Sequence, residues 1–183
     1  WLRGCRDDRI AGSTVGLHIE HNSRIDITAE EVREAFPLAK LEFLTIETEE
    51  LAEMSKNGFW GTSQLARIYP GKIRLGIDMT QLGPDWISVA GDTAKLRLPM
   101  PGLLEENFID EAESRPFHES GSWSSAEREM LYRKAHAAML ERNLTPARRQ
   151  EARKSATNQF SRALFALGFK YVIISYGNST SGK

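Results

Sequence analysis

A glycine-rich segment at the end of the chain has the spacing of a phosphate-binding loop. It runs from Gly177 through Gly182 to Lys183 and follows a predicted strand. Such loops bind phosphate through backbone amides at the N-terminus of a following helix. The sequence shows no helical pattern and no hydroxyl residue after Lys183. We therefore expect residues 178–183 to form a mobile polar tail and not a nucleotide site.

Two histidines near the N-terminus have residue types suited to a metal ion. His18 and His21 flank Glu20, within a segment, residues 14–22, that alternates between apolar and polar residues. The alternation predicts a half-buried strand, in which side chains three residues apart point to opposite faces. The two imidazoles could not share one ion without distortion. We expect no metal site here.

A run of acidic residues in the middle of the chain invites comparison with a calcium site. Calcium-binding loops space their oxygen ligands regularly around an internal glycine, and this run does not. We expect a solvated acidic segment with neither metal nor cofactor. The residues concerned are Glu105, Glu106, Asp110, Glu111, Glu113, His118 and Glu119.

The sequence carries no strong signature of a catalytic nucleophile. It has no Gly-x-Ser-x-Gly motif, and its single cysteine, Cys5, lies in the expected N-terminal flank. His118 near Ser120 and Ser122 is a weak acid/base candidate. A hydrolase that assembles two carboxylates in space would leave no spacing signal, so this alternative stays open. The expectation that we favour is a domain without enzymatic activity.

A predicted C-terminal helix carries a cluster of basic residues. Arg149 and Arg153 are one turn apart and predict a basic ridge, which we extend to a candidate anionic-partner patch. A pI near 6.5 argues against nucleic acid, so membrane lipid or an acidic protein is the expected partner. The patch comprises Arg148, Arg149, Arg153 and Lys154.

The distribution of charge along the chain offers a simpler explanation for the same basic residues. From Glu20 to Glu53 there are ten acids and three bases, whereas from Arg128 to Lys183 there are eleven bases and three acids. Opposite charges in the two halves can attract each other within the fold. Internal ion pairing therefore remains the alternative to an external anionic partner.

Length and composition are those of an ordinary globular domain. The 183 residues are 40% hydrophobic and 27% charged, with a formal net charge of −1. A chain of this size buries enough apolar surface to fold without disulfides or metal. We expect a flexible N-terminal flank over residues 1–13, a single domain over residues 14–177, and the polar tail.

The first half of the domain predicts one short helix and two strands. Thr28 and Glu31 form a capping box, so a helix begins at Ala29 and ends before Pro37. Residues 41–48 are rich in apolar and β-branched types and predict a strand. Residues 49–63 are polar and contain glycine, which predicts a loop with at most one helical turn. Strict alternation over residues 72–79 predicts a second strand.

The segment from Trp86 to Leu98 predicts a β-hairpin that turns at Gly91 and Asp92. A two-residue turn there sorts apolar from polar residues, because it places Ile87 opposite Leu96. The same register places Trp86 opposite Arg97, so we expect the Arg97 guanidinium to cover the indole ring.

The second half predicts an irregular acidic stretch to Ser122, two long helices and a final strand. Ser124 caps the first helix, and Thr145 caps the second, which ends at Leu167 before Gly168. Residues 169–176 are apolar on both faces, which predicts the central strand of a sheet. The expected fold is α+β, a mostly antiparallel sheet with the two helices packed on one face.

Several segments together resemble a bacterial family known as domain of unknown function 4230. They are Tyr69–Met79 (YPGKIRLGIDM), Ile87–Thr93 (ISVAGDT), Leu96–Pro101 (LRLPMP) and Gly168–Val172 (GFKYV), and the resemblance covers about residues 25 to 176. Pro70 departs from the family pattern and predicts an edge strand or a bulge. The resemblance carries over no catalytic residue or cofactor. It implies an N-terminal membrane anchor or export signal and a place in the cell envelope.

The first residues agree with that implication. Trp1 to Arg6 have the aromatic and basic character of a membrane interface, and Leu2 to Cys5 loosely resemble a lipoprotein cleavage motif. No run of 18 apolar residues occurs in the sequence, so we expect an anchor upstream of Trp1. The expected function is a non-enzymatic envelope module that is tethered to a membrane and binds a protein, lipid or small ligand.

Overall fold

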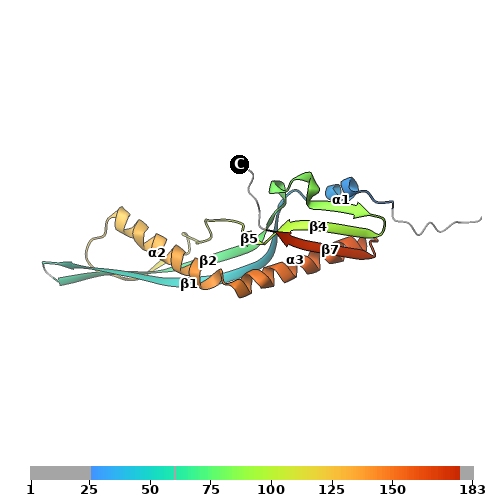
Figure 1. Ribbon diagram of the computed structural model, residues 1–183. Coiled ribbons are helices and arrows are strands. Elements are labelled where there is room, and N and C mark those ends of the chain that lie inside the picture. Colours follow the sequence, from blue (N-terminus) through green and yellow to red (C-terminus); the bar gives the residue numbers. More distant parts are fainter. Residues whose placement is uncertain (1–25, 60, 178–183) are drawn as a thin grey trace, which may run out of the picture.

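The computed structural model describes residues 26–59 and 61–177. These residues form an elongated molecule, in which a long β-hairpin extends from one end of a smaller sheet (Figure 1). The predicted strand over residues 14–22, the N-terminal flank and the polar tail lie outside the described residues.

The hairpin consists of β1 (Lys40–Gly58) and β2 (Gly61–Asp78). The two strands pair along their whole length, from Lys40 opposite Asp78 to Gly58 opposite Gly61. At a rise of about 3.3 Å per residue, the 19 residues of β1 span about 60 Å. The loop predicted over residues 49–63 is therefore wrong. These polar residues form strand because pairing with β2 satisfies their backbone groups, while only one face of the hairpin is covered.

Two short strands complete the first sheet on the other side of β2. β5 (Gly102–Leu103) and β6 (Arg115–Glu119) both pair antiparallel with β2. The stretch predicted as irregular thus contributes two pieces of strand. Pro70 lies inside β2 without a local shift of register to β1, so it marks neither an edge nor a bulge. The irregularity in the hairpin lies instead between Glu42 and Leu44.

The second sheet has the order β3-β4-β7, formed by β3 (Ile87–Ala90), β4 (Thr93–Pro99) and β7 (Tyr171–Gly177). The antiparallel pair β3 and β4 has the predicted register, with Ile87 opposite Leu96. β7 is parallel to β4 and pairs with no other described strand, so it is an edge strand and its predicted central position is wrong. Its outward apolar residues are exposed.

Trp86 does not belong to the hairpin. It ends a 3₁₀ turn, η2 (Pro84–Trp86), that follows η1 (Met79–Gln81). Its buried ring packs edge-on against Phe36 and lies 6.3 Å from the ring of Phe160, whereas Arg97 is exposed. The predicted cover of Trp86 by Arg97 is therefore wrong, although the hairpin register is right.

The three helices begin where their caps predict. α1 (Ala29–Ala35) starts after the Thr28 capping box, and α2 (Ser125–Asn143) after the Ser124 capping box. Thr145 caps α3 (Pro146–Ala166), and Gly168 follows its end with a φ of 102°. Among the described residues, no helix has the length and apolar content required to cross a membrane.

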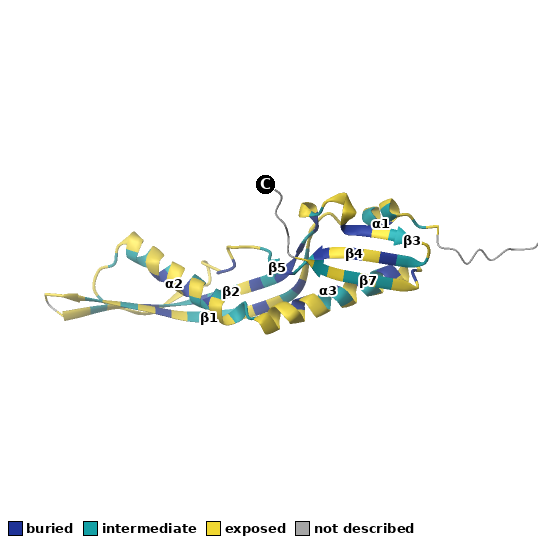
Figure 2. Ribbon diagram, in the orientation of Figure 1, coloured by how far each residue is buried: buried dark blue, intermediate teal, exposed yellow. Residues whose placement is uncertain are grey.

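The buried residues form two clusters (Figure 2). One lies between the inner face of β3-β4-β7 and the C-terminal half of α3, where Phe160 and Leu164 are buried. The other lies between α2 and the long hairpin and includes Leu65, Leu131 and Met139. α3 contributes Ala152 to the second cluster as well, so it connects the two. The predicted α+β fold with two long C-terminal helices is confirmed.

Candidate interaction surfaces

The basic residues predicted as an anionic-partner patch all lie on the first half of α3, and all are exposed. Arg149 and Arg153 form a ridge along the helix. At about 100° per residue, Arg148 and Lys154 lie on either side of that ridge. The patch therefore wraps around the helix and does not form one flat surface.

The ridge is held at the end of the small sheet. The guanidinium carbon of Arg153 lies 5.5 Å from the centroid of the Tyr176 ring, at the end of β7. The Tyr176 hydroxyl is 2.9 Å from Oγ1 of Thr157 and donates to the backbone carbonyl of Arg153 over 3.3 Å. Burial raises the pKa of Tyr176, which keeps this hydroxyl protonated. These contacts hold the backbone of Arg153 and the position of its side chain.

Three of the four patch residues are not neutralised within the described part of the chain. Arg148 pairs with Glu151 at 3.2 Å. No described carboxylate lies within ion-pair distance of Arg149, Arg153 or Lys154. Their positive charge is available to an external anion.

The basic residues of α2 behave differently, because each of its three arginines pairs with a carboxylate and Lys134 donates to a backbone carbonyl. Nη1 of Arg142 lies 2.7 Å from Oε2 of Glu50, and Lys134 donates to the carbonyl of Glu53 over 2.7 Å. The expected attraction between the two halves is therefore met at Arg142, whereas Arg149, Arg153 and Lys154 of α3 have no carboxylate partner in the described part of the chain.

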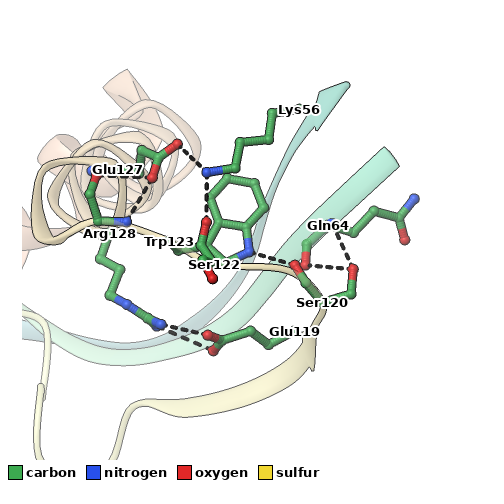
Figure 3. Close-up of polar contacts among 9 residues, drawn as sticks. Lys56, Gln64, Glu119, Ser120, Ser122, Trp123, Glu127 and Arg128 are labelled. Atoms are coloured by element: carbon green, nitrogen blue, oxygen red, sulfur yellow. Dashed lines mark hydrogen bonds and ion pairs between the residues drawn. The ribbon is translucent and has the colours of Figure 1, made fainter. Parts of the chain in front are cut away.

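A dense polar cluster joins the hairpin to the start of α2 (Figure 3). Lys56 donates to Oε1 of Glu127 over 2.8 Å and to the carbonyl of Ser122 over 2.7 Å. Its ammonium group lies 4.3 Å from the ring centroid of Trp123, whose indole donates to the carbonyl of Ser120. The hydrogen bond from Lys56 and the capping bonds of Ser124 lower the pKa of Glu127 to about 2. Lys56 thus connects β1 both to the loop before α2 and to the first turn of that helix.

Two residues of the weak acid/base candidate, Ser120 and Ser122, belong to the contacts between the hairpin and the loop before α2. Oγ of Ser120 accepts from the amide of Gln64 over 2.9 Å, and the Ser122 carbonyl accepts from Lys56. In the described part of the chain, no hydrogen bond joins His118 to either serine. The structure does not bring these residues together as a catalytic pair.

The acidic run lines part of an open groove of about 880 Å³ beside Pro70 and Gly71. Glu105 pairs with Arg74 at 3.8 Å, and Asp110 accepts from the amides of Ala112 and Glu113 in a turn. Glu119, outside the groove, pairs with Arg128. Among the described residues, no three His, Cys, Asp or Glu side chains come together as metal ligands. His18, Glu20, His21 and Cys5 lie outside the described residues.

The described carboxyl groups with a resolved pKa shift are all shifted downward. Hydrogen bonds lower the pKa of Glu31, Asp78, Glu119 and Glu127. A general acid at neutral pH requires the opposite shift, produced by burial or by a neighbouring carboxylate. None of these four shifts is in the direction that a general acid requires.

Sequence reasoning missed one surface. The outer face of β3-β4-β7 exposes Tyr171 and Ile173, whose side chains are 64% and 53% accessible. The apolar residues on both faces of the last strand suggested burial on both sides. The same signal also fits an edge strand whose outer face is an interaction surface.

Comparison with known proteins gives a family but no characterised relative. No curated protein and no solved structure matches the chain. The model of one family matches residues 37–174, which span the hairpin, both helices and most of β7. That match includes every segment on which the resemblance was based. The chain belongs to DUF4230, a family described as protein of unknown function.

Proposed function

We propose that this domain is a non-enzymatic binding module of the cell envelope, tethered to a membrane through a segment upstream of Trp1. In this proposal, α3 presents Arg149, Arg153 and Lys154 to an anionic partner. The observation that carries the binding role is the contrast between the two helices. Each of the three arginines of α2 pairs with a carboxylate, whereas these three bases of α3 have no described carboxylate partner.

The rigid setting of Arg153 on α3 supports this assignment. Arg153 is fixed through Tyr176 and Thr157, so the ridge starts from an ordered backbone and loses less conformational freedom on binding. The patch also lies on a helix that packs through buried alanines and Phe160. A charged surface on a rigid element is suited to recognition of an acidic partner.

The anionic partner is tested with two probes, a polyglutamate peptide and vesicles of phosphatidylcholine with phosphatidylglycerol. Arg149→Glu with Arg153→Glu is compared with Arg133→Glu and Arg162→Glu, an equal change of net charge outside the patch. We expect only the first pair to abolish binding to a probe. Equal loss in both double variants, or none in either, would remove the assignment to the patch on α3.

The tether is tested separately on the native protein. Envelope membranes are washed with high salt and then with detergent, and the protein is followed by immunoblot. We expect release by detergent and not by salt, because an anchor is held by the hydrophobic effect and a peripheral contact by charge. Release by salt alone would contradict the tether.

A further inference from the structure

The outer face of the three-stranded sheet is a flat surface with its own chemistry. The pairing places Ser88 beside Lys95, Lys95 beside Ile173, and Arg97 beside Ser175. Their neighbours in each strand point inward, where Leu96 and Leu98 join the core under α3. We use the term outer face for Ser88, Lys95, Arg97, Tyr171, Ile173 and Ser175.

The charge on the outer face is positive. Lys95 and Arg97 are exposed, and no described carboxylate forms an ion pair with either of them. The strands contribute no acidic residue to this face. Asp92, in the adjacent turn, is paired with Lys170 at 2.7 Å. An anionic surface could approach without meeting a negative charge on these strands.

The apolar part of the outer face suits a bilayer interface. Tyr171 and Ile173 lie on the edge strand, next to the two cations. Tyrosine is favoured at membrane interfaces because its ring is apolar and its hydroxyl stays hydrated. Lysine and arginine next to it attract anionic headgroups and keep their charge in the headgroup layer.

We propose that the outer face rests on the anionic surface of the bilayer to which the protein is tethered. This inference rests on the proposed function for the tether alone. Figure 1 shows α1 and the first described residues beside this sheet, at the end of the molecule opposite the β1–β2 turn. A tether that enters from the N-terminal side holds the outer face at high effective concentration near the membrane, which raises the occupancy of a contact that the two cations and two apolar side chains make on their own.

Contact between the outer face and the bilayer also restricts which kind of partner the α3 patch can bind. α3 packs on the inner face of the sheet through Phe160 and Leu164, and Arg153 contacts Tyr176 from that side. When the outer face rests on the bilayer, α3 lies on the far side of the sheet. The anionic partner of the α3 patch is then an acidic protein and not the same membrane.

Co-sedimentation with vesicles tests the inference on the 183-residue chain without any tether. The probes are vesicles of phosphatidylcholine with and without phosphatidylglycerol. Because each cation contributes about fivefold to the partition coefficient, Lys95→Gln with Arg97→Gln lowers binding to the anionic vesicles about 25-fold. Tyr171→Ser with Ile173→Ser also weakens binding. The matched control, Arg133→Gln with Arg162→Gln, removes the same charge at residues outside the outer face and outside the α3 patch, and it retains binding.

Three results would overturn the inference. One is a loss of binding in the control as large as in the outer-face variant, and another is binding that no variant changes. The third is a dimer in solution that Ile173→Arg dissociates, which would assign the face to a second copy of the chain. All substituted side chains are exposed, and circular dichroism confirms folding of each variant. Because no tether is involved, failure here is distinct from failure of the membrane fractionation.

Discussion

The ammonium nitrogen of Lys56 lies 2.8 Å from Oε1 of Glu127, and this contact joins the outer half of the long hairpin to the first turn of α2. The pKa of Glu127 is lowered from 4.5 to about 2, first by this hydrogen bond and then by Ser124. A carboxylate with a lowered pKa stabilises the fold above its unfolded pKa, and this contribution is lost as the pH falls towards the folded value.

We therefore expect the free energy of unfolding to decrease between about pH 4.5 and pH 2, partly through protonation of Glu127. Glu127→Gln and Lys56→Met should each flatten this part of the profile, measured by urea denaturation at a series of pH values. Arg133→Met, which removes a cation from the exposed side of α2, should leave the profile unchanged. A Glu127→Gln profile parallel to that of the original chain would show that protonation of Glu127 does not contribute to the pH dependence of stability.

Phe160 is the central side chain of the core under the small sheet. It is 1% exposed and its ring lies 5.3 Å from Phe36 and 5.8 Å from Phe43. Phe160→Ala removes contacts with three elements and leaves a cavity, so we expect a loss of about 3–5 kcal/mol in the free energy of unfolding. Phe165→Ala, on the same helix but 52% exposed, should cost less than about 1 kcal/mol. Equal losses in thermal or chemical denaturation would contradict this core.

Gly76 marks the place where the hairpin leaves no room for a side chain. A Cβ at this position would overlap the carbonyl oxygen of Leu41 and lie 2.7 Å from Cδ1 of Leu104. Gly76→Ala should therefore destabilise the fold by about 1–3 kcal/mol through overpacking. Its register partner Gly102 has no atom within 4 Å of the corresponding position, and Gly102→Ala serves as the control. If neither change lowers the Tm, the backbone of β1 must shift to make room for a side chain at position 76.

Arg142 and Glu50 connect the basic and acidic halves of the chain. The Glu50 side chain is 17% exposed, and its Oε2 lies 2.7 Å from Nη1 of Arg142. Arg142→Leu leaves this carboxylate without its cation, so we expect a loss of about 1–3 kcal/mol. The double variant with Glu50→Leu should recover part of it, because neither charge is left alone. Additive losses in a double-mutant cycle would show that the pair does not interact.

The sequence predicted the parts of the fold that local chemistry determines. Thr28, Ser124 and Thr145 each cap a helix, and the turn at Gly91 sets the register that pairs Ile87 with Leu96. In each case the side chain or turn that decides the structure lies within a few residues of the element. The two long helices could therefore be placed to within one or two residues.

Long-range pairing explains the rest. The polar composition of residues 49–63 is typical of a loop. Their backbone groups are instead satisfied by pairing between β1 and β2, and α2 covers one face of the hairpin. The apolar residues on both faces of the final strand predict a central strand. Its actual place at the edge depends on parallel pairing with β4, which no local pattern in the sequence indicates. The unpaired bases on α3 were visible as a basic ridge, but only the structure separates them from the paired bases of α2.

The orientation of the domain on a membrane tests the account most directly. Nitroxide labels are attached to Ile173→Cys on the outer face and to Asn158→Cys on exposed α3, each with Cys5→Ser, and their accessibility is measured on phosphatidylglycerol-containing vesicles. We expect the label at position 173 to become accessible to oxygen in the lipid and protected from a water-soluble relaxant. The label at position 158 should stay in water. Lipid contact at position 158, or water exposure at both positions, would contradict the account.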